Sequence, residues 1–265
     1  MTEVEAAAQR PVWEAVEPPG GWGRPWPQCV ELAKALPSRQ WTLVGGLMVQ
    51  LHAAVAGLPV SRPTSDVDII LHIETGAATT SAVSGVLTTL GYELQKSINH
   101  EAPAHRFLRG KDQIDVMVAD HLAPKTVPRL GGRQAFQVAG GTQALKRTVN
   151  CRVTMDGGEP VLLSIPNALG ALVLKGAAYQ EDSRDRGRHL DDAAVLLATV
   201  SNPLKLVAEM GGSDRSRMLT LNRALSDADH DSWNVLDPGD RNRGISNLAV
   251  LCANPDRLQL KRLGD

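Results

Sequence analysis

The segment from Trp41 to Glu74, WTLVGGLMVQLHAAVAGLPVSRPTSDVDIILHIE, decides how the rest of the chain is interpreted. It opens with a short β-prone run that ends at Gly45 and Gly46, and an apolar stretch of helical character follows from Leu47. Glycines at a strand-to-helix turn let the backbone approach an anion closely, and the free N–H groups of the helix point toward it. The segment therefore predicts a phosphate-binding turn at Gly45 and Gly46.

A second strand in the same segment carries Asp66 and Asp68 on either side of Val67. Residues two apart on a strand share a face, so both carboxylates point the same way. Such a pair alone often marks only the solvated face of a strand. Two ionised carboxylates repel each other, however, and a hard divalent cation between them relieves the repulsion. The chain has these features in the order strand, Gly-Gly, helix, and strand with Asp-x-Asp. This order predicts a site that binds one or two magnesium ions and an NTP.

A third carboxylate, Asp115, is expected on a neighbouring strand. The runs His105 to Leu108 and Gln113 to Val118 are predicted to form a hairpin around the turn Arg109 to Asp112. The motifs so far resemble a polymerase-β-like site, which uses a third carboxylate on a neighbouring strand because two metal ions need more oxygen ligands than two aspartates provide. The resemblance implies this role for Asp115. The alternative is an edge aspartate that faces solvent. His105 and Arg106 lie on the opposing strand, and two interpretations stay open: one of them faces the site, or both belong to a solvated face, which is the favoured interpretation.

Together these motifs resemble the nucleotidyltransferase superfamily of the DNA polymerase β type, whose signature is a Gly-Gly or Gly-Ser turn followed by Asp-x-Asp. The run from Arg62 to Asp68, RPTSDVD, is most similar to the AbiEii-type toxin branch. The resemblance implies that Arg62, Thr64 and Ser65 help the glycine turn to hold the triphosphate. One departure is the spacing: nineteen residues separate Gly46 from Asp66, longer than is usual in the family.

A second group of residues begins with Lys175 on a predicted helix from Pro166 to about Gln180. It resembles the AbiEii-type pattern of a helix lysine, a basic loop and a Lys/Arg-Asp-Leu-x-Asp-Leu segment. The resemblance places Lys175 beside the triphosphate and Asp192 where it orients the lysine or helps to activate the acceptor. His189 stands where the family has its first acid. Helical phase does not choose between Asp191 and Asp192, and the pattern favours Asp192. The alternative for Lys175 is an exposed helix residue.

Composition limits the range of partners. Aromatic residues make up only 3% of the chain, so base stacking on an aromatic platform is not the expected mode of recognition. The formal net charge is −1, so a nucleic acid must be held by a local basic patch. On the predicted helix from Ser213 to Leu225, three arginines form either a solvated face or an RNA-phosphate-binding ridge: Arg215, Arg217 and Arg223. No apolar run is long enough to span a membrane, and we expect a cytoplasmic protein.

The expected fold is α+β: a polymerase-β-like nucleotidyltransferase mixed sheet flanked by helices, with a helical C-terminal half. The predicted layout is an extended Pro- and Trp-rich arm over residues 1–27, a nucleotidyltransferase-like domain over 28–165 and a mainly helical domain over 166–265. The arm is expected to lie across the domain and to bury some of its three tryptophans, Trp13, Trp22 and Trp26.

The predicted function is magnesium-dependent transfer of a nucleotidyl group from an NTP to an acceptor hydroxyl. For the toxin branch, the resemblance implies an RNA acceptor such as the 3′ end of tRNA, and a separately encoded antitoxin. The alternatives are a small-molecule nucleotidyltransferase, a phosphotransferase that moves the γ-phosphate, and a degenerate module that binds a nucleotide or a protein partner.

Overall fold

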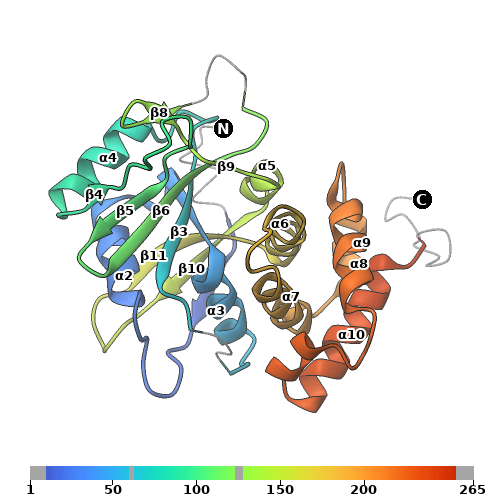
Figure 1. Ribbon diagram of the computed structural model, residues 1–265. Coiled ribbons are helices and arrows are strands. Elements are labelled where there is room, and N and C mark those ends of the chain that lie inside the picture. The colour runs from blue at the N-terminus through green and yellow to red at the C-terminus, as the bar shows by residue number, and fades with distance from the viewer. Residues whose placement is uncertain (1–9, 60–62, 123–127, 255–265) are drawn as a thin grey trace. The chain divides into compact units, whose positions relative to one another are not determined.

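A computed structural model describes residues 10–59, 63–122 and 128–254. The chain divides into two compact units, Met1–Ala171 and Leu172–Asp265. The first unit mixes sheets with helices, and the second is helical. The prediction of an α+β fold with a helical C-terminal half is confirmed (Figure 1). The predicted domain boundaries after residues 27 and 165 stay predictions.

The first unit is built on a sheet with the strand order β2-β3-β6-β5-β4, in which β9 also pairs with β6. β3 lies antiparallel to β2 and parallel to β6, and β6 lies antiparallel to β5. The strands of this sheet are β2 (Trp41–Val44), β3 (Asp66–Leu71), β4 (Glu93–Leu94), β5 (Arg106–Arg109), β6 (Asp112–Ala119) and β9 (Gln137–Val138). The helices of this part of the chain are α2 (Trp26–Ala35), η1 (Ser38–Gln40), α3 (Gly45–Val55), α4 (Thr80–Thr89), α5 (Gly141–Leu145) and α6 (Ala168–Glu181), which crosses into the second unit.

The centre of this sheet is apolar on both faces. All four residues of β2 are buried, and the end of β3, Ile69 to Leu71, is fully buried. The sequence of α3 is mostly apolar, and eight of its eleven residues are accordingly buried. Because β3 lies between β2 and β6, its polar first half is held rigidly by a strand on each side.

The N-terminal segment forms the edge strand β1 of a second sheet, which has the strand order β1-β10-β11. β1 (Val12–Ala15) pairs in parallel with β10 (Thr148–Val153), which is antiparallel to β11 (Val161–Pro166). As expected, tryptophans of this segment are buried: Trp26 donates from Nε1 to Gln50 Oε1 at 2.7 Å, and Trp22 donates to the carbonyl of Thr154 at 3.0 Å. Two further strands, β7 (Arg129–Leu130) and β8 (Arg133–Gln134), form a small hairpin.

The second unit packs the rest of α6 with α7 (Gly187–Thr199), α8 (Pro203–Glu209), α9 (Asp214–Leu225), η3 (Asp231–Val235) and α10 (Pro238–Cys252). Trp233 is fully buried here, and its Nε1 donates to the carbonyl of Leu225 at 3.2 Å. Gly244 of α10 lies against this ring, since an added Cβ would come within 2.8 Å of it. Within the described ranges, every helix is too short or too polar to cross a bilayer.

Candidate functional site

The register of two strands, β3 and β6, brings the predicted carboxylates together. On the parallel pair β3 and β6, Asp68 lies directly opposite Asp115, and Asp66 lies opposite Gln113. Carboxylate oxygens of Asp66, Asp68 and Asp115 all lie within 4.8 Å of one another. Asp115 is buried, while the other two are half-buried. The acidic triad, meaning these three aspartates, therefore forms one cluster with access to solvent.

The glycine turn lies directly against this triad. Gly45 has φ +68°, and a Cβ placed there would lie 1.9 Å from Asp68 Oδ2. A Cβ on Gly46 would lie 2.7 Å from the Cβ of Thr64. The two glycines are the first residues of α3, two positions earlier than the sequence predicts. The side chain of Val44 at the N-cap makes no capping hydrogen bond, and the N-terminus of the helix lies next to Asp68.

Arg106 contacts the triad, whereas the sequence favoured a solvated face for it. Its Nε donates to Asp115 Oδ1 at 3.0 Å and its Nη2 donates to Oδ2 at 2.9 Å, a bidentate ion pair. The hydrogen bond to Asp115 raises the pKa of Arg106, and the charges of Asp66 and Asp68 act in the same direction. The interpretation of Arg106 as part of a solvated pair is therefore wrong. The predicted hairpin contained the signal, because a turn at Gly110 and Lys111 places Arg106 opposite Asp115.

His105 also lies beside the acidic triad and not on a solvated face. Its Nε2 lies 3.9 Å from Asp115 Oδ2, and its ring packs against Phe136 with 5.2 Å between centroids. Burial lowers the pKa of His105, which outweighs the opposite effect of Asp115. The imidazole is therefore neutral at pH 7, so the guanidinium of Arg106 supplies the positive charge beside Asp115.

Two neutral donors complete the hydrogen bonding of the triad. Gln113 Nε2 donates to Asp66 Oδ2 at 3.3 Å and to Asp115 Oδ2 at 3.2 Å. Thr64 Oγ1 donates to Asp66 Oδ1 at 2.8 Å. Thr64 thus lies between the glycine turn and the triad, and its predicted role in holding the triphosphate stays a prediction. Ser65 is exposed beside it, and Arg62 lies outside the described residues.

The donor set of the triad fits magnesium. Mg²⁺ takes hard oxygen ligands at about 2.0–2.1 Å and is held by a few carboxylates together with substrate phosphates and water. Ligand oxygens on such an ion lie about 3–4 Å apart, so oxygens within 4.8 Å of one another need only a small closure. Three carboxylates and one guanidinium give this corner a formal charge of −2. A divalent cation would neutralise that charge.

Lys175 and Asp192 form an ion pair inside the second unit. Lys175 Nζ on α6 lies 2.7 Å from Asp192 Oδ2 on α7, and the two side chains are 7% and 4% exposed. Lys175 is therefore not an exposed helix residue, and Asp192, rather than Asp191, is its partner. His189, at the position of the family's first acid, bonds Asp182 instead at 3.1 Å. The catalytic roles of Lys175 and Asp192 stay predictions.

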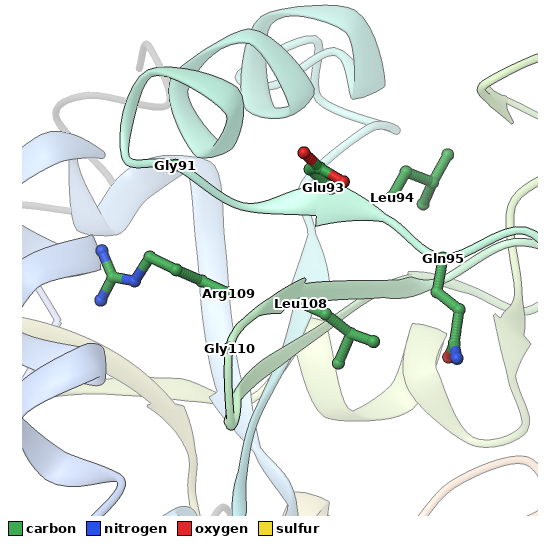
Figure 2. A pocket seen from close by; sticks show the side chains of 7 residues that line it. All are labelled: Gly91, Glu93, Leu94, Gln95, Leu108, Arg109 and Gly110. Carbon is green, nitrogen blue, oxygen red and sulfur yellow. The ribbon is translucent and has the colours of Figure 1, made fainter.

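A hollow of about 400 Å³ lies at the outer edge of the sheet, between β4 and β5. Figure 2 shows Arg109 turned away from Leu94, Gln95 and Leu108, which line the hollow. The guanidinium of Arg109 donates to both carboxylate oxygens of Glu31 and stacks on the ring of Tyr92. Arg109 is therefore already paired within the fold, and Glu93 is the other charged residue that lines the hollow.

Substitution of Gly45 by alanine tests the contact between the turn and the triad. We expect Gly45→Ala to displace Asp68, because the added methyl group collides with its carboxylate, and to weaken Mn²⁺ binding at least tenfold in addition to the strain of a positive φ. Gly110→Ala is the matched control, since Gly110 also has positive φ but no atom within 4 Å of an added Cβ. Equal metal affinity in the two variants, measured by electron paramagnetic resonance, would contradict the arrangement.

Substitutions in the Lys175–Asp192 ion pair distinguish a structural role of these residues from a catalytic one. Lys175→Met leaves a buried carboxylate without its cation, and we expect a loss of about 3–5 kcal/mol in the free energy of unfolding. The double variant Lys175→Met with Asp192→Leu should recover most of the lost stability. If the two residues are catalytic, it should still show no nucleotidyl transfer. Lys205→Met, which breaks an exposed pair, should cost less than about 1 kcal/mol. Full activity in a folded double variant would show that neither residue is catalytic.

Comparisons with known proteins give one distant structural likeness. No protein-family model and no curated protein sequence matches the chain. Among solved structures, the chain is similar to an antigenic nucleotidyltransferase-like protein from Paracoccidioides brasiliensis, with a TM-score of 0.47 and 15% sequence identity. The likeness covers 74% of this chain and 86% of that one. At this level the likeness gives no basis for assigning an activity.

Proposed function

We propose that this protein is a nucleotidyltransferase, which moves a nucleotidyl group from an NTP to an acceptor hydroxyl. The observation that carries the proposal is the convergence of Asp66, Asp68 and Asp115 within 4.8 Å, directly against a glycine turn that begins a helix. An acidic cluster alone has many explanations. Its contact with a phosphate-binding turn supports a site for a metal-bound triphosphate in particular.

In the proposed reaction, the acceptor hydroxyl attacks the α-phosphorus of the NTP, the bond to the β-phosphate oxygen breaks, and pyrophosphate leaves while the hydroxyl proton passes to water. Bound magnesium, held by the triad, would neutralise phosphate charge and lower the pKa of the attacking hydroxyl. The N–H groups at Gly45 and Gly46 would bind phosphate oxygens. Ser65 precedes Asp66 in the same loop and would contribute a hydroxyl donor. Thr64 would bind a phosphate oxygen after its hydroxyl turns from Asp66, and Arg62 would be a further phosphate ligand.

The nature of the acceptor is a finer part of the proposal. The resemblance to AbiEii-type toxins favours an RNA acceptor such as the 3′ end of tRNA, a protein antitoxin and a cytoplasmic location. One observation in the second unit supports an anionic acceptor. A hollow of about 280 Å³ is lined by Tyr179, Gln180, Arg186, Thr220, Arg223 and Ala224. Within the described ranges, the two arginines donate to carbonyl and hydroxyl oxygens and to no carboxylate.

The arginines of α9 do not form one continuous ridge. Arg215 donates to the carbonyls of Cys252 and Ala253, so it stabilises the end of α10. Arg223 donates to Thr220 Oγ1 at 3.1 Å beside the hollow, and Arg186 stacks on the ring of Tyr179. Arg217 donates to Gln180 Oε1. In place of a ridge of three arginines, we propose the surface around Arg186 and Arg223 as the part that binds RNA phosphate.

The reaction class is tested with NTPs labelled at the α- or γ-phosphate, in the presence of magnesium and total tRNA. We expect label from the α-phosphate, and none from the γ-phosphate, to enter the acceptor. Asp68→Asn should reduce this transfer at least a hundredfold, since it removes one charge from the metal site. Asp112→Asn is the control on β6, where Asp112 pairs with Arg109 instead of the triad. Transfer of the γ-label would identify a phosphotransferase, and equal transfer by the wild type and Asp68→Asn would exclude catalysis at this triad.

The acceptor surface is tested by RNA binding without NTP or metal. Replacing Arg186 and Arg223 together by glutamine should weaken tRNA binding about tenfold. The slope of log affinity against log salt concentration should also become less negative by about 1.4, because two phosphate contacts are lost. Arg188→Gln is the control, since Arg188 already pairs with Asp182 at 3.3 Å. An unchanged salt slope in the double variant would remove this surface from the proposal and leave the triad unaffected.

A further inference from the structure

Arg106 holds one member of the triad while much of its own charge remains accessible. Its side chain is 37% exposed, and within the described chain only two of its five N–H donors are bound, both to Asp115. We propose that Arg106 makes the triad select a metal–nucleotide complex over the free metal ion, so that metal loading depends on the nucleotide. This inference rests on the proposed function, because it assigns Arg106 a task at that same site.

The physical reason is the sign of the charge that each ligand brings. A free divalent cation at Asp115 must approach the guanidinium that already pairs with this carboxylate, and the two positive charges repel each other. A metal–triphosphate complex carries net negative charge, so the same guanidinium attracts it. The three remaining N–H donors of Arg106 match the oxygens of a phosphate group.

No rearrangement of the triad is required for this selection. Each carboxylate oxygen of Asp115 has two acceptor sites, and Arg106 uses one on Oδ1 and one on Oδ2. Asp115 therefore retains a free acceptor site on Oδ1 for a metal ion while the ion pair persists. Gln113 also donates to Oδ2, so Oδ1 is the less occupied oxygen.

A purely structural role for Arg106 predicts a different outcome. If the guanidinium only positioned Asp115, its removal would weaken the binding of free metal and of metal–nucleotide together. The proposed role predicts opposite signs: free metal binds more tightly without Arg106, and metal–nucleotide binds more weakly. Arg106→Lys keeps the charge but loses the bidentate fork, so both constants should shift in the same directions as in a neutral variant but by less.

The experiment measures two dissociation constants in the full-length chain: Mn²⁺ alone by electron paramagnetic resonance, and the magnesium complex of an α,β-methylene NTP by calorimetry. We expect Arg106→Gln to bind Mn²⁺ about tenfold more tightly and the nucleotide complex about tenfold more weakly. Arg109→Gln is the matched control, because Arg109 lies on the same strand and pairs with Glu31 and Asp112. It should leave both constants unchanged.

Shifts of the two constants in the same direction, or no shift in either, would overturn the role of Arg106. If Arg106→Gln does not fold, as judged by its thermal unfolding, Arg106→Met retains the aliphatic stem and is held to the same two criteria. Failure of this inference is distinguishable from failure of the proposed function. A wild-type chain that binds neither Mn²⁺ nor the nucleotide complex would refute both, whereas a wild type that binds them and an Arg106→Gln variant without effect would refute only the selection.

Discussion

Electrostatic repulsion among three carboxylates is the constraint on which the account of this protein depends. At an effective dielectric constant of about 20, two unit charges 4.8 Å apart repel by roughly 3 kcal/mol, and Asp66, Asp68 and Asp115 form three such pairs. The bidentate pair with Arg106 offsets part of this cost, and donors from Gln113 and Thr64 offset more. The fold nevertheless leaves a formal charge of −2 at one corner of a sheet, which is the arrangement expected where a cation binds.

The first unit holds this unfavourable cluster in place through β3. This strand lies between β2 and β6, and its apolar end is buried in the core, so the register of its two aspartates is fixed by packing. The same strand presses Asp68 against Gly45, which leaves no room for a side chain at that position. The carboxylates and the helix N-terminus are thus brought together by backbone geometry, and the positive end of α3 adds favourable potential beside them.

Part of this site follows from the sequence, and the reason lies in local geometry. Asp66 and Asp68 share a face because of strand periodicity, and the glycine turn is marked by residue type. The placement of Asp115 opposite Asp68 needs the parallel pairing of β3 with β6, and pairing between strands far apart in sequence leaves no local signal. Arg106 was predictable in principle, because a hairpin turn fixes the register of its strands. It was misassigned because a charged strand residue is most often solvated.

In the second unit, the sequence alone does not show which of two adjacent aspartates faces inward. Helix α7 is apolar nearly all round, so its periodicity does not decide whether Asp191 or Asp192 faces inward. The choice follows from a partner on another helix, since the ammonium group of Lys175 pairs with Asp192.

The most direct test of the central claim is a crystal structure with Mn²⁺ and a non-hydrolysable NTP, in which anomalous scattering locates the metal. The account predicts a Mn²⁺ peak bonded to an oxygen of Asp66, of Asp68 and of Asp115, with the triphosphate at the N–H groups of Gly45 and Gly46. Metal and nucleotide bound elsewhere, with the three carboxylates contacted only by protein donors and water, would contradict it.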